Sequence, residues 1–158
     1  VMKIPGEAVS KGVEAFHGAG RRMEFKGTYH GAQVYDDYAH HPDELRATLE
    51  AIRSMGDHRL VLAFQPHTYT RTKLLMDDFI RELKKADVVV LAEIYAARES
   101  NTIGISSADL AAQIPGSIYC ETLQDVTETL RKIVKEGDIV VTMGAGDIFR
   151  AGEALLAE

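Results

Sequence analysis

The chain has 158 residues, of which 46% are hydrophobic and 27% are charged, and these proportions are typical of one globular domain. Its formal net charge of -6 disfavours a nucleic-acid partner, because a surface that binds phosphates needs an excess of Lys and Arg. No apolar run approaches the ~20 residues that span a bilayer and no export signal opens the sequence, so we expect no membrane contact and a cytoplasmic location.

The first two predicted elements are a helix and a hairpin. Residues 1 to 20 have helical spacing that ends in glycines, and we interpret them as the end of a preceding unit. Met23 to Tyr29 and Gln33 to Asp36 predict two strands joined at His30-Gly31, since glycine supplies the backbone freedom that a tight turn needs. We therefore expect an antiparallel hairpin to open the domain.

From Pro42 onward, strand patterns alternate with helix patterns. Leu60 to Phe64, Val88 to Leu91 and Ile139 to Val141 are continuous apolar runs, which predict strands covered by helices on both faces. Segments with helical spacing separate and follow these runs. The alternation predicts an α/β fold of the Rossmann-like, doubly wound class, with a mostly parallel sheet and helices on both faces.

Three helix starts carry recognisable signals. Pro42 suits the first position of a helix, where its missing N–H costs nothing. Ser106 with Asp109, and Thr122 with Asp125, have the spacing of capping boxes. We expect a helix to begin at each of these places.

The residues with the most reactive side chains directly follow predicted strands. The first group contains Asp37, Tyr38 and His40, at the carboxyl edge where open α/β sheets bind ligands. A carboxylate there can accept hydrogen bonds from sugar hydroxyls, while a phenol and an imidazole can donate to an anion. In the alternative interpretation, Asp36 or Asp37 caps the following turn and the histidines are surface residues.

A metal site formed by His40, His41 and His67 is a third interpretation, and it would indicate a metal-dependent hydrolase. Adjacent histidines in an extended segment point apart. The sequence also has no pair of histidines four residues apart, as a helical metal site requires. We therefore predict no metal site in the chain.

The second group ends in Arg71, beside the start of a helix that we place near Thr72. Helix N–H groups and a guanidinium together favour a carboxylate or a phosphate, and Arg binds such an anion with two parallel hydrogen bonds. Arg71 and Lys73 are unfavourable at the positive end of a helix unless an anion is present. We therefore predict that Arg71 binds an anion and that Lys73 is solvated.

The third group is the turn Gly144-Ala145-Gly146-Asp147. Its two glycines let the backbone turn sharply and approach a ligand, and we expect Asp147 to cap the next helix. The sequence contains neither a complete dinucleotide fingerprint nor a Gly-Lys-Thr or Gly-Lys-Ser phosphate loop. The chain therefore cannot wrap a triphosphate by that route.

Taken together, these junctions resemble one family. The runs Asp36 to Pro42, Phe64 to Thr72, Ile94 to Glu99 and Thr142 to Ile148 are similar in order and spacing to the C-terminal domain of the Mur ligases, and especially of their alanine-adding branch. The resemblance covers residues 20 to 158. It implies that residues 1 to 19 are the tail of the central ATPase domain of that family, or a linker.

The resemblance implies an ATP-dependent, amide-bond-forming ligase of peptidoglycan precursor synthesis. The substrates would be UDP-N-acetylmuramate, L-alanine and ATP, and Mg²⁺ would be bound mainly by the central domain. The N-terminal and central domains of the same polypeptide would be the partners of this domain. Because the chain has no phosphate loop, we expect no complete catalytic set in it and no activity from it alone.

The resemblance also assigns individual residues. Arg22 matches the arginine that reaches the ATP phosphates, Asp37 matches the carboxylate that binds the ATP ribose, and Arg71 would neutralise the carboxylate of the amino acid. The residues expected beside the substrates are Tyr38, His40, His67 and Arg71.

One departure and two alternatives stay open. Many relatives carry Arg where this chain has Thr68, so a second basic contact to the amino-acid carboxylate is in doubt. Within the family, the alternative is the recycling ligase that attaches a ready-made tripeptide to the same sugar nucleotide. Outside enzymes, the alternative is a non-catalytic module that binds an anion or a nucleotide.

Overall fold

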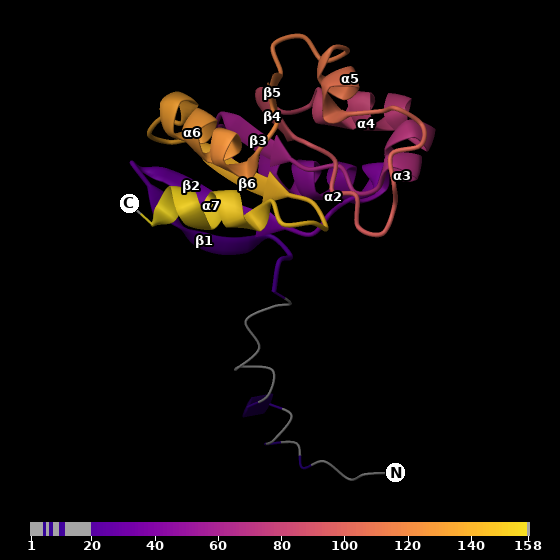
Figure 1. The fold of residues 1–158 in the computed structure, drawn as a ribbon. Helices are drawn as coiled ribbons and strands as arrows, with labels where there is room; N and C mark the ends of the chain where they lie inside the picture. Colours follow the sequence, from indigo (N-terminus) through magenta and orange to yellow (C-terminus); the bar gives the residue numbers. More distant parts are fainter. Residues whose placement is uncertain (1–4, 6, 8–9, 12–19, 158) are drawn as a thin grey trace.

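The computed structural model describes residues 5, 7, 10, 11 and 20–157. The helix predicted for residues 1 to 20 falls almost entirely outside these described residues. From residue 20 onward, the chain forms one sheet with helices on both of its faces, as Figure 1 shows. The predicted α/β class is therefore confirmed.

An antiparallel hairpin opens the domain. It consists of β1 (Glu24–Tyr29) and β2 (Ala32–Asp37). His30 and Gly31 connect the two strands with positive φ angles of 46° and 83°, which match the twist of a tight hairpin. Both the hairpin and its turn agree with the prediction.

The other strands are β3 (Leu60–Phe64), β4 (Val88–Ala92), β5 (Ile118–Cys120) and β6 (Ile139–Met143). The sheet order is β1-β2-β6-β3-β4-β5, and every neighbouring pair except the hairpin is parallel. After β5 the chain returns to place β6 between β2 and β3. Such a reversal of strand order creates a switch point, where ligands bind beyond the carboxyl ends of the strands.

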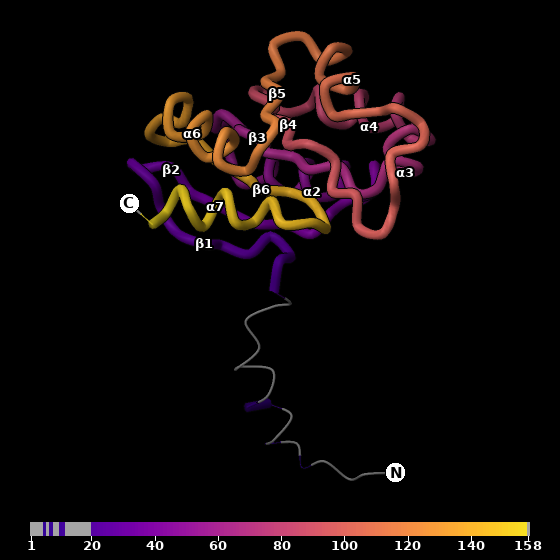
Figure 2. Tube along the Cα trace, in the orientation of Figure 1, coloured from indigo at the N-terminus to yellow at the C-terminus, as the bar shows by residue number. Residues whose placement is uncertain are grey.

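The helices are α2 (Pro42–Arg53), α3 (Tyr69–Leu74), α4 (Met76–Leu83), α5 (Ser107–Ala111), α6 (Leu123–Ile133) and α7 (Phe149–Leu156). Residues of α2, α4 and α5 share one buried apolar cluster with one face of the sheet, and residues of α6 and α7 share a second cluster with the other face. Figure 2 shows α7, in yellow, running alongside the indigo hairpin, which it contacts through β1 and β2. No helix in the described part of the chain has the length and apolar character needed to cross a bilayer.

The three helix starts predicted from Pro42, Ser106 and Thr122 are confirmed, and one further capping box is present. Ser106 and Thr122 cap α5 and α6, each in a reciprocal pair with an aspartate three residues later. Pro42 occupies the first turn of α2, and the side chain of His41 caps that helix together with Glu44. Histidine is not among the usual capping residues, so the sequence did not signal this third box.

Replacing Thr122 with alanine is expected to lower the free energy of unfolding by about 1 kcal/mol. The reason is that the Thr122 hydroxyl oxygen accepts from the Asp125 N–H at 3.1 Å, while its own proton goes to the Asp125 carboxylate at 2.7 Å. Thermal unfolding should show a midpoint lower by about 2 to 4 °C. Thr122→Ser keeps both hydrogen bonds and should unfold close to the original temperature, and equal losses in the two variants would contradict the capping explanation.

Candidate functional site

Four rings form a row along the carboxyl edge of the sheet. The ring centres of Tyr38 and His40 lie 5.6 Å apart, those of His40 and His67 lie 5.8 Å apart, and those of His67 and Tyr95 lie 5.6 Å apart. Tyr38 and His40 follow β2, His67 follows β3, and Tyr95 follows β4. The loops that the sequence placed at one edge therefore converge, and we call these four residues the aromatic row.

Two neighbouring arginines lie near the Tyr38 ring, but they differ in their other contacts. The guanidinium carbon of Arg22 lies 5.6 Å from the Tyr38 ring centre, and its positive charge helps to lower the pKa of Glu44. Arg21 lies 4.9 Å from the same ring but also donates to the Asp36 carboxylate and to two carbonyl oxygens of the glycine turn. Arg22 is exposed and available to a ligand, whereas Arg21 is committed to the fold.

Asp37 is buried and holds the turn between β2 and α2. It is 3% exposed, and its carboxylate accepts from the N–H groups of Met23 and Ala39, each at 2.8 Å, and from the Thr48 hydroxyl at 3.3 Å. This geometry is the turn-capping role that the sequence left open as the alternative. The contact with the ATP ribose stays a prediction, and it must use the one remaining acceptor position of about four on a carboxylate.

His40 and His41 are adjacent in the sequence, but their side chains make different contacts. The Nδ1 atom of His41 accepts from the Asp43 N–H at 3.4 Å as part of the α2 cap. His40 joins the aromatic row, and its Nδ1 lies 3.0 Å from the Tyr38 carbonyl oxygen. Among the residues that the structure describes, no group of three or more His, Cys, Asp or Glu side chains is arranged to hold a metal ion.

The start of α3 differs from the expectation. The helix begins at Tyr69 rather than near Thr72. Glu99 already occupies its start, because the carboxylate accepts from the Thr70 N–H at 3.0 Å and from the Thr70 hydroxyl. Hydrogen bonds from Thr70 lower the pKa of Glu99, which is therefore charged at neutral pH. The sequence suggested that a ligand anion binds both to these N–H groups and to Arg71. Because Glu99 occupies the N–H groups, a ligand anion cannot bind to them.

Arg71 itself lies beside the aromatic row. Its Nη1 atom is 3.5 Å from Nδ1 of His67, and no described carboxylate pairs with it. Burial lowers the pKa of His67, and the positive charge of Arg71 and the neighbouring His40 lower it further. His67 is therefore neutral at pH 7, which leaves Arg71 as a half-buried cation whose charge is not compensated by an ion pair.

The glycine turn between β6 and α7 packs tightly against β3 and Tyr95. A Cβ atom on Gly144 would lie 2.7 Å from the Gln65 carbonyl oxygen, and one on Gly146 would lie 2.7 Å from Cγ of Tyr95. Asp147 does not cap α7, so that prediction was wrong. The buried side chain of Gln65 takes this place by accepting from the N–H groups of Asp147 and Ile148 at 3.0 and 3.1 Å.

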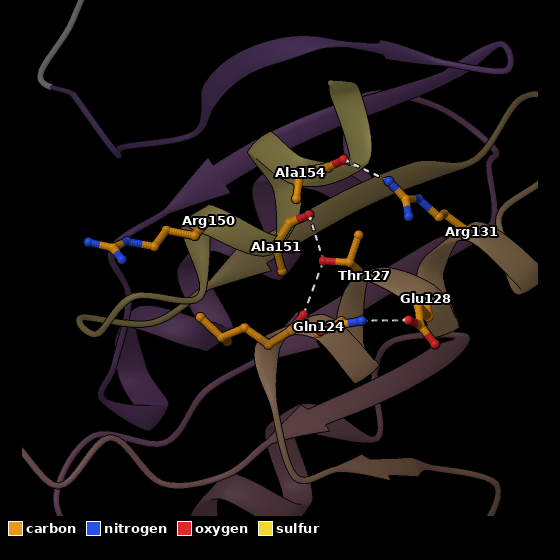
Figure 3. Close-up of a pocket in the computed structure, with 8 residues that line it drawn as sticks. Gln124, Thr127, Glu128, Arg131, Arg150, Ala151 and Ala154 are labelled. Carbon is orange, nitrogen blue, oxygen red and sulfur yellow. Dashed lines mark hydrogen bonds between the residues drawn. The ribbon is translucent and has the colours of Figure 1, made fainter. Parts of the chain in front are cut away.

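Two hollows lie near these elements. The first, of about 240 Å³, adjoins the aromatic row and is bordered by Gln65, Tyr95 and Asp147. The second, of about 420 Å³, lies between α6 and α7, and Figure 3 shows that its walls are tied to each other. The Thr127 hydroxyl bonds the Ala151 carbonyl oxygen at 3.4 Å, and the Arg131 guanidinium donates to the Ala154 carbonyl oxygen at 3.2 Å. Of the aromatic row, Tyr95 borders the first hollow, together with the acidic residues Glu93, Glu121 and Asp147.

Comparison with known proteins identifies relatives of this chain. Residues 21–146 match the family described as Mur ligase, glutamate ligase domain. The UDP-N-acetylmuramate–L-alanine ligase of Lachnospira eligens is 48% identical over 98% of this chain and 35% of its own length. The UDP-N-acetylmuramate–alanine ligase of Thermotoga maritima has a TM-score of 0.74 at 26% identity, over 94% of this chain and 32% of the other.

A murein peptide ligase of Psychrobacter arcticus has the same fold, with a TM-score of 0.70 at 23% identity, over 94% of this chain and 32% of the other. The chain thus spans about a third of the length of the relatives that it matches. The family match covers most of the domain, from Arg21 at the hairpin to Gly146 in the glycine turn. The chain belongs to the Mur ligase family.

Proposed function

We propose that this domain is the C-terminal part of an ATP-dependent ligase that joins L-alanine to UDP-N-acetylmuramate. The observation that carries the proposal is Arg71, a half-buried cation without a carboxylate partner in the described residues, set beside a neutral His67 at the rim of the sheet. Such a group suits the carboxylate of a small amino acid. The similarity to L-alanine ligases over almost the whole chain supports the same assignment.

The proposed reaction forms an amide bond in two steps. The substrate carboxylate attacks the γ-phosphate of ATP, so that an acyl phosphate forms and ADP leaves. The amine of L-alanine then attacks the acyl carbon, and the tetrahedral intermediate expels phosphate. The role of this domain is to hold L-alanine and part of ATP, because bringing reactants together in a closed site supplies much of the rate.

The residues divide between the two small substrates. Arg22, which is exposed beside the Tyr38 ring, would bind the phosphates of ATP, whereas Asp37 would bind the ribose through its remaining acceptor position. Arg71 would bind the carboxylate of L-alanine, with Tyr38, His40 and His67 beside it. Mg²⁺ is usually bound by one or two carboxylates together with waters and substrate phosphates, and its protein ligands would come mainly from the rest of the polypeptide.

The deciding experiment is a ligation assay on the full-length protein. L-alanine, L-serine, glycine and the tripeptide of the recycling ligases compete as acceptors, and the products are separated and weighed by mass spectrometry. We expect ATP-dependent formation of the L-alanine product as the main reaction. A preference for the tripeptide would favour the recycling ligase, and the absence of any ligation would favour a binding module.

The domain alone is expected to bind ATP with a Kd weaker than about 1 mM, which corresponds to about -4 kcal/mol. The reason is that its 158 residues contain no phosphate loop, so Arg22 and Asp37 would act without the main phosphate contacts. Isothermal titration of the domain with ATP tests this. Micromolar affinity would show that the domain holds the nucleotide by itself and would contradict the division of contacts.

A further inference from the structure

Gln65 makes an unusually complete set of hydrogen bonds for one buried side chain. It is 5% exposed, and its Oε1 atom accepts from the N–H groups of Asp147 and Ile148 at 3.0 and 3.1 Å. Its Nε2 atom donates to the Asp147 carboxylate at 3.0 Å. The amide therefore satisfies the start of α7 and one carboxylate at once, and only a group that both accepts and donates can do this.

The same turn is held from its other side by Arg21. The guanidinium donates to the carbonyl oxygens of Gly144 and Gly146 at 2.6 and 3.2 Å. It lies between the rings of Tyr38 and Phe149, 4.9 and 4.6 Å from their centres. Arg21 fixes the part of the turn that faces the hairpin, which leaves Gln65 to fix the part that faces β3.

The part of the turn near Gln65 supports one end of the aromatic row. Gly146 packs so closely on Tyr95 that a Cβ atom there would lie 2.7 Å from the ring. Tyr95 stacks on His67, with 22° between the ring planes, and its backbone pairs with Pro66 and Thr68. His67 in turn contacts Arg71. A shift of the turn would therefore be passed through Tyr95 and His67 to Arg71.

We propose that Gln65 is a positioning residue for the amino-acid site. It locks the glycine turn and so keeps Tyr95, His67 and Arg71 in the arrangement that receives the amino-acid carboxylate. This inference rests on the proposed function, because it takes Arg71 as the group that binds this carboxylate. The residues proposed to bind ATP, Arg22 and Asp37, lie on the Arg21 side of the turn. There, the hydrogen bonds from Arg21 to the Gly144 carbonyl oxygen and from the Gly144 N–H to the Asp37 carbonyl oxygen hold the backbone without Gln65, so these residues depend on Gln65 much less.

The test exchanges donor and acceptor across the pair in the full-length protein. Gln65→Glu keeps the size and the acceptor for the two N–H groups but places a second carboxylate against Asp147. The double variant Gln65→Glu with Asp147→Asn restores one donor and one acceptor. We expect the single variant to raise the KM for L-alanine about tenfold, since small misplacements of a site have effects of this order. The KM for ATP should change less than twofold.

The double variant is expected to return the KM for L-alanine to within about threefold of the original value. The exposed Gln113→Glu, which also adds one negative charge, is the matched control and should change neither KM. Thermal unfolding of all variants separates positioning from loss of fold. If Gln65→Glu leaves the KM for L-alanine unchanged, or if the double variant fails to recover while it folds normally, the inference is wrong. If the unmodified full-length protein does not ligate L-alanine, the proposed function is contradicted instead.

Discussion

Replacing Arg71 with alanine in the full-length protein is expected to raise the KM for L-alanine by about 10- to 150-fold and to leave the KM for ATP nearly unchanged. Losing hydrogen bonds to a charged group typically costs about 1.5 to 3 kcal/mol, and about 1.4 kcal/mol corresponds to a factor of ten. Burial is the first cause of the lowered pKa of His67 and does not depend on Arg71, so His67 supplies little of the lost positive charge in the variant. Steady-state kinetics with each substrate varied in turn measures the effect.

Two further variants sharpen this prediction. Lys73→Ala removes a positive charge two residues away on the same helix, from an exposed side chain, and should change neither KM by more than twofold. Arg71→Lys keeps the charge but loses the planar pair of donors, so its KM should lie between those of the original protein and Arg71→Ala. If Arg71→Ala raises the KM for ATP as much as the KM for L-alanine, Arg71 is not the carboxylate ligand.

The sequence predicted the central strands well because they are buried on both faces. Leu60 to Phe64 is a continuous apolar run, and all five residues of β3 are buried. β5 was missed for the opposite reason. It has only three residues, lies at the edge of the sheet and exposes Tyr119, so its pattern differs little from a loop. Short edge strands are defined by pairing, which a local pattern does not contain.

The sequence predicted which loops meet at the edge of the sheet, but not which side chains and backbone groups pair between distant loops. The convergence of His40 and His67 follows from parallel strands that end at one edge. The partner of the Asp147 N–H could not be foreseen, because Gln65 lies 82 residues away in the sequence. Glu99 likewise reaches the start of α3 from another loop, 29 residues after Thr70. Such contacts depend on the packing of loops, which periodicity and motif spacing do not describe.

Thr68 shows how these contacts change a prediction from the sequence. Its position raised doubt because many relatives carry Arg there. In the structure, the Thr68 side chain contributes to the hydrogen bonds that lower the pKa of Glu99, after those from Thr70. Its backbone has a positive φ of 69° and pairs with Tyr95. Thr68 therefore supports the loop that carries Tyr95 and Glu99, and Arg71 remains the cation beside the aromatic row.

Replacing Asp138 with alanine is expected to lower the free energy of unfolding by about 3 kcal/mol at pH 7. Asp138 is 3% exposed, and its carboxylate accepts two hydrogen bonds from Arg59, at 2.9 and 2.6 Å, and one from the Lys135 N–H at 2.8 Å. Removing one partner of a buried pair typically costs about 3 to 5 kcal/mol. We expect the lower end because the Arg59 side chain is 32% exposed, so water can solvate part of its charge.

The dependence of this loss on pH identifies its cause. Burial alone would raise the pKa of Asp138, but the hydrogen bonds from Arg59 and the Lys135 N–H outweigh burial and lower the pKa below the value in the unfolded chain. The stabilisation is therefore fully present above the unfolded value of about 3.9 and is lost as the pH falls through the lower folded value. Urea unfolding at pH values from 7 to 3 should show the original protein and Asp138→Ala converging at the acidic end. The exposed Asp57→Ala should match the original protein throughout, and a difference for Asp138→Ala that stays constant with pH would mean that lost packing, not the carboxylate, explains the effect.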